Sequence, residues 1–240
     1  MQIKYRLGKF STFALVSLVA GSTIAVAPLQ TQKAQAAKKD PACVVIDQGF
    51  TPFFEDSSYS DKDVFGVSVG FVIQNKTKKN VRFNALRINA YSGSGKLLVS
   101  EDAIGSRTLA ARDSLFNGYE METTETVKSI KIVVSCSPTT ERVTKIQSAG
   151  SGIVDQADAS SDSYKIKGVF YNRQKTTDFG NITYVLRDSS NRIVAGGWTN
   201  SPGVVPRGTD VAWETWSKLF TDFPDGTFPE LKVESSISSN

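Results

Sequence analysis

Histidine is missing from all 240 residues, which removes the most common general base and the usual zinc ligand from the available chemistry. Nucleophile pairs of the Ser-His and Cys-His kinds are therefore excluded. Carboxylate pairs remain, Glu55 with Asp56 and Asp222 with Asp225, and two carboxylates suffice for glycoside hydrolysis. Closeness in a loop does not place two carboxylates across a cleft, so we assign no catalytic residue and expect no enzyme activity.

Two acidic loops, residues 55–63 and 155–162, offer the oxygen ligands that calcium prefers. Neither loop has the EF-hand or nonapeptide spacing, and solvated turns explain both equally well. We expect no metal and no cofactor.

The three tryptophans lie in the last quarter of the chain, close to three loop phenylalanines. On a strand, Trp213 and Trp216 point to opposite faces, so both can be core residues only if the segment turns helical. An exposed tryptophan could stack on a sugar ring or accept an apolar side chain from a protein partner. Alternatively, Trp213 fills a core and the other aromatics cap its open end. The candidate ligand-binding residues are Trp198, Trp213, Trp216, Phe220, Phe223 and Phe228.

A basic turn follows Asn75, with Lys76, Lys78 and Lys79 around Thr77. It could contact anionic wall polymers, and a solvated turn explains it equally well.

The first 36 residues have the pattern of a secretory signal peptide. Lys4, Arg6 and Lys9 precede an apolar run over residues 10–27, and residues 34–36 form a small-residue cleavage site. No later segment approaches 18 uninterrupted apolar residues, so we expect no membrane span in the mature chain. We therefore predict an exported protein, either released or held at the cell surface.

Removal of this leader changes the charge balance. The leader contains four of the 28 basic residues and none of the 24 acidic ones, which leaves 24 of each in the mature chain. Nucleic-acid binding depends on net basic charge that releases counterions. We therefore do not expect a nucleic-acid partner.

The only two cysteines are Cys43 and Cys136. An exported chain with two cysteines favours one disulfide, because the compartment outside the membrane permits it.

The chain contains an internal duplication with an offset of 95 to 99 residues. Residues 70–75 match 168–172, residues 88–98 match 184–194, and residues 109–112 match 204–207. At an offset of 99, Cys43 falls on Arg142 and Cys136 on Ser235. The second copy thus lacks both cysteines together, as bonded partners would.

Short runs rich in Val, Ile, Phe and Tyr, separated by Gly, Asn, Asp and Ser, predict strands throughout both copies. The fold class that follows is all-β, with two tandem antiparallel β-sandwich domains at 37–138 and 143–240, joined by a linker at 139–142. The expected strands are 43–47, 64–74, 82–91, 96–101, 114–121 and 129–136, then 143–148, 164–172, 180–187, 192–198, 210–216 and 230–236.

Both copies resemble the FxLYD-type domain, an immunoglobulin-like sandwich of exported prokaryotic proteins. Residues 184–188 keep the aromatic, the Leu and the Asp of its core motif but have Arg187 where Tyr is usual. The first copy keeps Tyr91, and Asn75 and Asn172 match the asparagine that ends the preceding strand. The resemblance implies an immunoglobulin-like fold outside the cytoplasm and no shared catalytic residues.

We therefore expect a non-catalytic binding or structural module of the cell envelope that recognises a surface polymer or glycan. The alternative is a protein-binding module, as an adhesion, assembly or inhibitor component.

Overall fold

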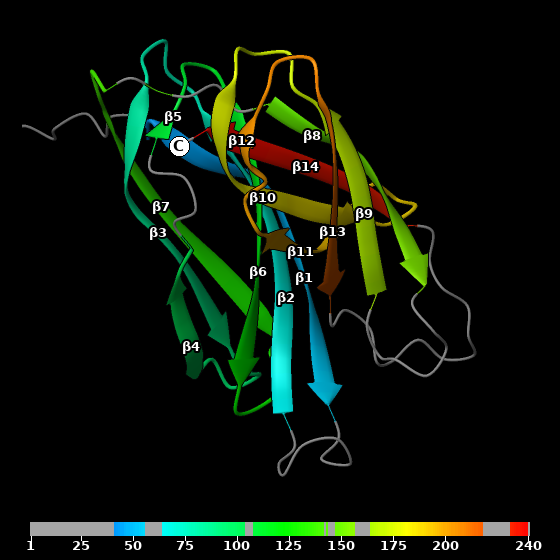
Figure 1. Cartoon of the computed structure of the whole chain (residues 1–240). Helices are drawn as coiled ribbons and strands as arrows, with labels where there is room; N and C mark the ends of the chain where they lie inside the picture. Colours follow the sequence, from blue (N-terminus) through cyan, green and yellow to red (C-terminus); the bar gives the residue numbers. More distant parts are fainter. Residues whose placement is uncertain are drawn as a thin grey trace, which may run out of the picture. The chain divides into compact units, whose positions relative to one another are not determined.

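The computed structural model describes residues 41–55, 64–103, 108–141, 143, 147–156, 164–217 and 231–239, and they form strands joined by turns (Figure 1). The leader expected over residues 1–36 lies outside these ranges. The first half comprises β1 (Cys43–Glu55), β2 (Val64–Asn75), β3 (Val81–Tyr91), β4 (Leu97–Asp102), β5 (Thr108–Leu109), β6 (Ser114–Thr123) and β7 (Ser129–Pro138). The second half comprises β8 (Gln147–Gln156), β9 (Tyr164–Tyr171), β10 (Thr177–Arg187), β11 (Ile193–Thr199), β12 (Gly203–Val205), β13 (Asp210–Ser217) and β14 (Lys232–Ser239). The described part of the chain has no helix that could cross a membrane.

The two halves repeat one antiparallel arrangement. The first half has a β1-β2-β6 sheet and a second sheet in which β3 pairs with β4, β5 and β7. In the second half, β8-β9-β13 corresponds to the former and β11-β10-β14 to the latter. There the two sheets are continuous, because β8 pairs with both β9 and β14. The predicted all-β class with antiparallel sandwiches is confirmed.

Each half has its own apolar core, built from the inward residues of its two sheets. The first core includes Val69, Phe71 and Leu86, and the second includes Phe179, Tyr184 and Trp213. These residues occupy alternate positions of their strands, since every second side chain of a strand faces inward. A third, smaller cluster of Val72, Val185, Ile193 and Phe116 joins the halves.

Equivalent asparagines, the last residue of β2 and the residue that follows β9, show that the halves share their turn geometry. The buried side chain of Asn75 donates from Nδ2 to the backbone oxygens of Lys79, Leu109 and Ala110 at 2.8, 3.3 and 2.8 Å. Asn172 donates in the same way to Lys175, Val205 and Pro206 at 3.4, 2.9 and 3.2 Å. Each side chain therefore clamps two turns together, because its amide is buried and must be satisfied there.

These clamps correct the expected alignment of residues 109–112 with 204–207. Leu109 occupies the position of Val205, one residue further on than expected. The residue of the turn with left-handed backbone follows the same corrected alignment. It is Arg112 in the first half, with φ 64°, and Gly208 in the second half, with φ 80°. The expected register matched arginine to arginine, whereas the backbone equates Arg112 with a glycine that adopts positive φ without strain.

Strand boundaries lie within three residues of the expected ones except at the first strand of each half, and the short strands β5 and β12 were not expected. β1 continues to Glu55, well beyond the expected residue 47, with a register shift between Val45 and Asp47. Pro52 is tolerated there because β1 is an edge strand of its sheet. The strand expected over 143–148 overlaps β8 only at residues 147 and 148, since β8 runs from Gln147 to Gln156, and residues 144–146 lie outside the described residues. Its small residues, such as Gly150 and Gly152, have low strand propensity, so composition did not indicate a strand there.

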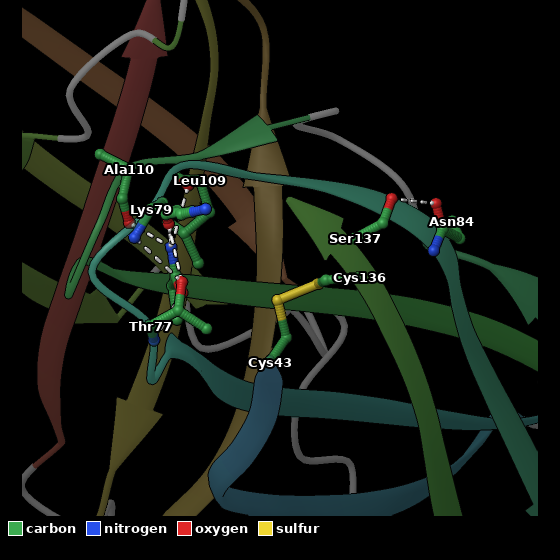
Figure 2. The surroundings of a disulfide bond; sticks show 9 residues. Cys43, Thr77, Lys79, Asn84, Leu109, Ala110, Cys136 and Ser137 are labelled. Atoms are coloured by element: carbon green, nitrogen blue, oxygen red, sulfur yellow. Dashed lines mark hydrogen bonds between the residues drawn. A yellow bond between two sulfur atoms is a disulfide. The ribbon is translucent and has the colours of Figure 1, made fainter. Parts of the chain in front are cut away.

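A disulfide joins Cys43 to Cys136 and ties β1 to β7, as predicted (Figure 2). Their Cα atoms lie 5.7 Å apart. Cys136 pairs with Phe83, and the equivalent Phe179 pairs with Ser239, so the counterpart of Cys136 is Ser239 and not the expected Ser235. The longer connection between β13 and β14 produces this shift. In the second half, β8 and β14 are hydrogen-bonded neighbours where the first half has its disulfide.

Three glycines form a row across the first sheet of the first half. Gly49 is the register partner of Gly70, and Gly70 is the partner of Gly118. We call these residues the glycine row. Because none has a side chain, this row leaves a channel on the sheet surface that a strand can enter.

β11 of the second half lies over the glycine row and therefore crosses β1, β2 and β6. A Cβ atom built on Gly118 would lie 2.0 Å from the Gly197 nitrogen, and one on Gly70 would lie 2.2 Å from the Ala195 oxygen. At Gly49, it would lie 1.6 Å from the Ile193 oxygen. Backbone thus packs on backbone, and the halves are in direct contact (Figure 1).

Arg187 adds an ion-pair network to this contact. Its guanidinium is only 9% exposed and bonds Asp47 of the first half at 2.5 Å and Glu234 of β14 at 2.7 Å. Burial opposes charge on Glu234, but hydrogen bonds from Arg187 and Lys232 hold its pKa below the ordinary value. Arg187, which stands where the FxLYD motif usually has Tyr, therefore contributes to the contact between the two halves.

This lowered pKa predicts an acid-dependent loss of stability. A carboxylate with a lowered folded pKa stabilises the protein above its unfolded pKa and loses that contribution as the pH falls through the folded value. We expect the Tm to decline as the pH drops below the ordinary 4.5 of Glu234. In Glu234→Gln this part of the decline should be absent. Thermal unfolding across acidic pH measures it, with exposed Glu122→Gln as control; equal acid dependence in both variants would contradict the prediction.

Candidate functional site

The exposed surface of β9 and β13 contains the aromatic residues that are the best candidates for binding. The two strands pair antiparallel from Tyr171 opposite Asp210 to Tyr164 opposite Ser217, and β13 is the last strand of its sheet. Alternate residues of each strand face outward. The outer β9–β13 face, as we call it, consists of Lys165, Lys167, Val169, Tyr171, Asp210, Ala212, Glu214 and Trp216.

Trp213 points inward from this pair of strands. Its side chain is 7% exposed, its Nε1 donates to the Ala149 oxygen at 2.9 Å, and its ring stacks on Tyr184 with centroids 6.3 Å apart. Gly168 on the facing strand makes room, since a Cβ there would lie 2.4 Å from the indole. Trp213 is thus a core residue whose only polar group is satisfied.

Trp216 lies on the opposite surface and is 54% exposed. The Lys165 ammonium group is 5.4 Å from the centre of its ring, within cation–π range. The same nitrogen forms an ion pair with Glu214 at 2.7 Å. The expected opposite orientation of Trp213 and Trp216 is therefore confirmed, and polar groups surround an indole whose face is partly open.

Two further apolar side chains extend the outer β9–β13 face. Val169 and Tyr171 are 55% and 50% exposed. Sequence reasoning missed both, although they share the alternation that places Lys165 outward. Aromatic surface next to charged hydrogen-bonding groups suits a ligand with alternating apolar faces and hydroxyl groups, such as a sugar chain.

The other candidate residues lie elsewhere. Trp198 of β11 is 47% exposed. The next residue, Thr199, donates from Oγ1 to the Glu214 oxygen at 3.2 Å, so the end of β11 approaches β13. Phe220, Phe223 and Phe228 lie outside the described residues. Trp216 and Trp198 are therefore the members of the expected set that the structure describes as exposed.

A groove of about 460 Å³ lies where the two halves meet. Its lining includes the apolar side chains of Phe50, Ile130 and Ile193, and Lys128 and Arg192 are its cations. Arg192 is engaged by Asp188 at 2.7 Å. No pattern in the sequence predicts this groove, because its walls come from three strands of different halves and adjoining turns. The lining residues are Gln48, Gly49, Phe50, Lys128, Ser129, Ile130, Arg192, Ile193 and Val194.

Among the described residues, no group of three or more Cys, Asp or Glu side chains is arranged to hold a metal ion. The acidic loops at 55–63 and 155–162 fall largely outside those residues, as do Asp56, Asp222 and Asp225.

The architecture and the site define an all-β protein of two packed antiparallel halves with an exposed aromatic face. No family model matches the chain, and no curated protein is significantly similar to it.

Proposed function

We propose that the protein is an exported, non-catalytic binding module of the cell envelope that recognises a surface glycan or related polymer through the outer β9–β13 face. The observation that carries this proposal is the exposure of Trp216, Tyr171 and Val169 on one sheet surface. Leaving large apolar side chains in water has a free-energy cost, which binding of a ligand can relieve. The charged pair Lys167 and Glu214 lies between Trp216 and Val169, so apolar and hydrogen-bonding groups alternate along this face.

The sequence supports the setting. The basic start, apolar run and small-residue cleavage site of residues 1–36 are those of an exported protein. A disulfide is compatible with that location. The FxLYD resemblance also implies an exported protein, and it implies no shared catalytic residues.

Trp216→Ala tests the proposal. We expect the purified wild-type protein to sediment with isolated cell envelopes and the variant to bind at least about tenfold more weakly, since an aromatic at the centre of an interface contributes about 1.4 kcal/mol or more. Quantifying the pelleted fraction against envelope concentration gives the two affinities. Circular dichroism verifies that the variant is folded.

Leu97→Ala is the matched control, because Leu97 is 50% exposed on β4 of the first half. It should sediment like the wild type. Unchanged sedimentation of folded Trp216→Ala would exclude this face as the binding site. A wild type that stays in the supernatant but purifies in stable complexes would favour the alternative of a protein-binding module.

A further inference from the structure

Basic side chains are concentrated in four turns of an otherwise acidic unit. Six of the 28 basic residues precede Asp40, so residues 40–240 contain 22 basic and 24 acidic residues. The turns 76–80, 110–113, 172–176 and 206–209 hold seven of those basic residues and one acidic residue, Asp113. The remaining segments hold 15 basic and 23 acidic residues. The net charge of residues 40–240 is therefore close to zero, although the four turns are basic and the rest of the unit is acidic.

The asparagine clamps hold these turns in pairs. In the first half, Asn75 joins turn 76–80 to turn 110–113, and Arg112 donates to the Lys76 backbone oxygen. In the second half, Asn172 joins turn 172–176 to turn 206–209. The seven basic residues are exposed and project from fixed backbone: Lys76, Lys78, Lys79, Arg112, Arg173, Lys175 and Arg207.

Figure 1 shows both pairs of turns at the same end of the unit, the upper end of the view, and β13 runs downwards away from them. Trp216 is the next-to-last residue of β13 and is therefore at the end of this strand away from the turns. We infer that this basic end is a second binding surface, for a flexible linear polyanion with closely spaced phosphate or sulfate groups. Tyr171 of the outer β9–β13 face adjoins these turns, since its hydroxyl oxygen would lie 3.4 Å from a Cβ at Gly208, but the recognition does not depend on Trp216 at the other end of that face.

The arrangement favours a polymer over a small ion or a duplex. The cations stand in two groups on separate halves, so only an extended ligand contacts both, and contact with both raises its affinity through effective concentration. Exposed lysines and arginines that bind phosphates give a salt-dependent attraction. Duplex DNA is stiff and broad, and it would bring its charge close to the acidic remainder of the surface, beginning with Asp178 and Asp210 beside the second pair of turns.

Two double variants test the basic end: Lys78→Glu with Lys79→Glu, and Arg173→Glu with Lys175→Glu. Each changes the net charge by the same amount as the control, Lys128→Glu with Lys131→Glu, which alters exposed cations elsewhere. The probe is long-chain inorganic polyphosphate, with dextran sulfate, tripolyphosphate and duplex DNA as comparisons. Fluorescence anisotropy of labelled probe measures affinity.

For wild type we expect polyphosphate affinity to fall roughly a hundredfold between about 50 and 200 mM salt, as for about four engaged phosphates. Each test variant should bind at least about tenfold more weakly than the control, and tripolyphosphate should compete poorly. Equal weakening by the control, undiminished binding by both test variants, or tighter binding to duplex DNA would each overturn the inference. Trp216→Ala should leave polyphosphate binding intact, so failure of the glycan proposal is distinguishable from failure here.

Discussion

Replacing Gly118 with valine is expected to destabilise the protein by about 4 kcal/mol or more, since it forces a side chain into a place already filled by backbone. The nearest atoms to a Cβ at this position are the Gly197 nitrogen at 2.0 Å and the Gly196 carbonyl carbon at 2.1 Å. Neither belongs to a flexible side chain, so the strand as a whole must shift. Moving β11 would also break the bond from Ser68 Oγ to the Gly196 oxygen.

Urea unfolding of the wild type and Gly118→Val measures this loss. Gly93→Ala is the control, because a Cβ there meets only Lys128 Cγ at an ordinary 3.6 Å. The control should be nearly neutral. If Gly118→Val unfolds at the same urea concentration as the control, the close contact between β11 and the glycine row does not exist in solution.

Opening the disulfide is expected to lower the free energy of unfolding by about 4 to 5 kcal/mol, from the chain entropy of a loop with 93 residues of separation. The double substitution of Cys43 and Cys136 by alanine removes the crosslink. Cys43 is 2% exposed, so packing contributes as well. The first half should be affected most, since it lacks the β8–β14 pairing that the second half has instead.

Reduced wild-type protein separates the crosslink from the packing, because it keeps both sulfur atoms. It is prepared by unfolding and refolding with reductant, and its urea unfolding is compared with that of the oxidised form. The difference between the two should account for most of the effect. Coincident unfolding curves for reduced and oxidised protein would show that the disulfide contributes no stability.

The sequence predicts the strand positions and the facing of side chains, because alternation and local composition control both. Ten of the strands begin or end close to their expected positions because runs of β-branched and aromatic residues are interrupted by turn residues. Alternation also placed Trp213 and Trp216 on opposite surfaces. β8 was misplaced because Gly150 and Gly152 have the composition of a turn. The β8 segment forms a strand because it has a pairing partner on each side.

Contacts between the halves were beyond sequence reasoning. Arg187 and Asp47 are 140 residues apart, and nothing in either segment identifies its partner. The glycine row is equally hidden, because a glycine inside a strand usually indicates a bulge or weak pairing. The crossing of β11 alone shows that Gly49, Gly70 and Gly118 all make room for the backbone of the same strand. The groove beside Lys128 depends on the same crossing.

Packing of backbone on backbone along the glycine row limits how the chain can be divided or recombined. Tandem repeats can often be gained, lost or exchanged because each unit is complete. Here a first half separated from the second would expose Val72 and Phe116, and the second would expose Val185 and Ile193. An exposed apolar sheet surface promotes aggregation. The two copies of the duplication therefore form one folding unit, and a substitution at their contact in one copy constrains the other.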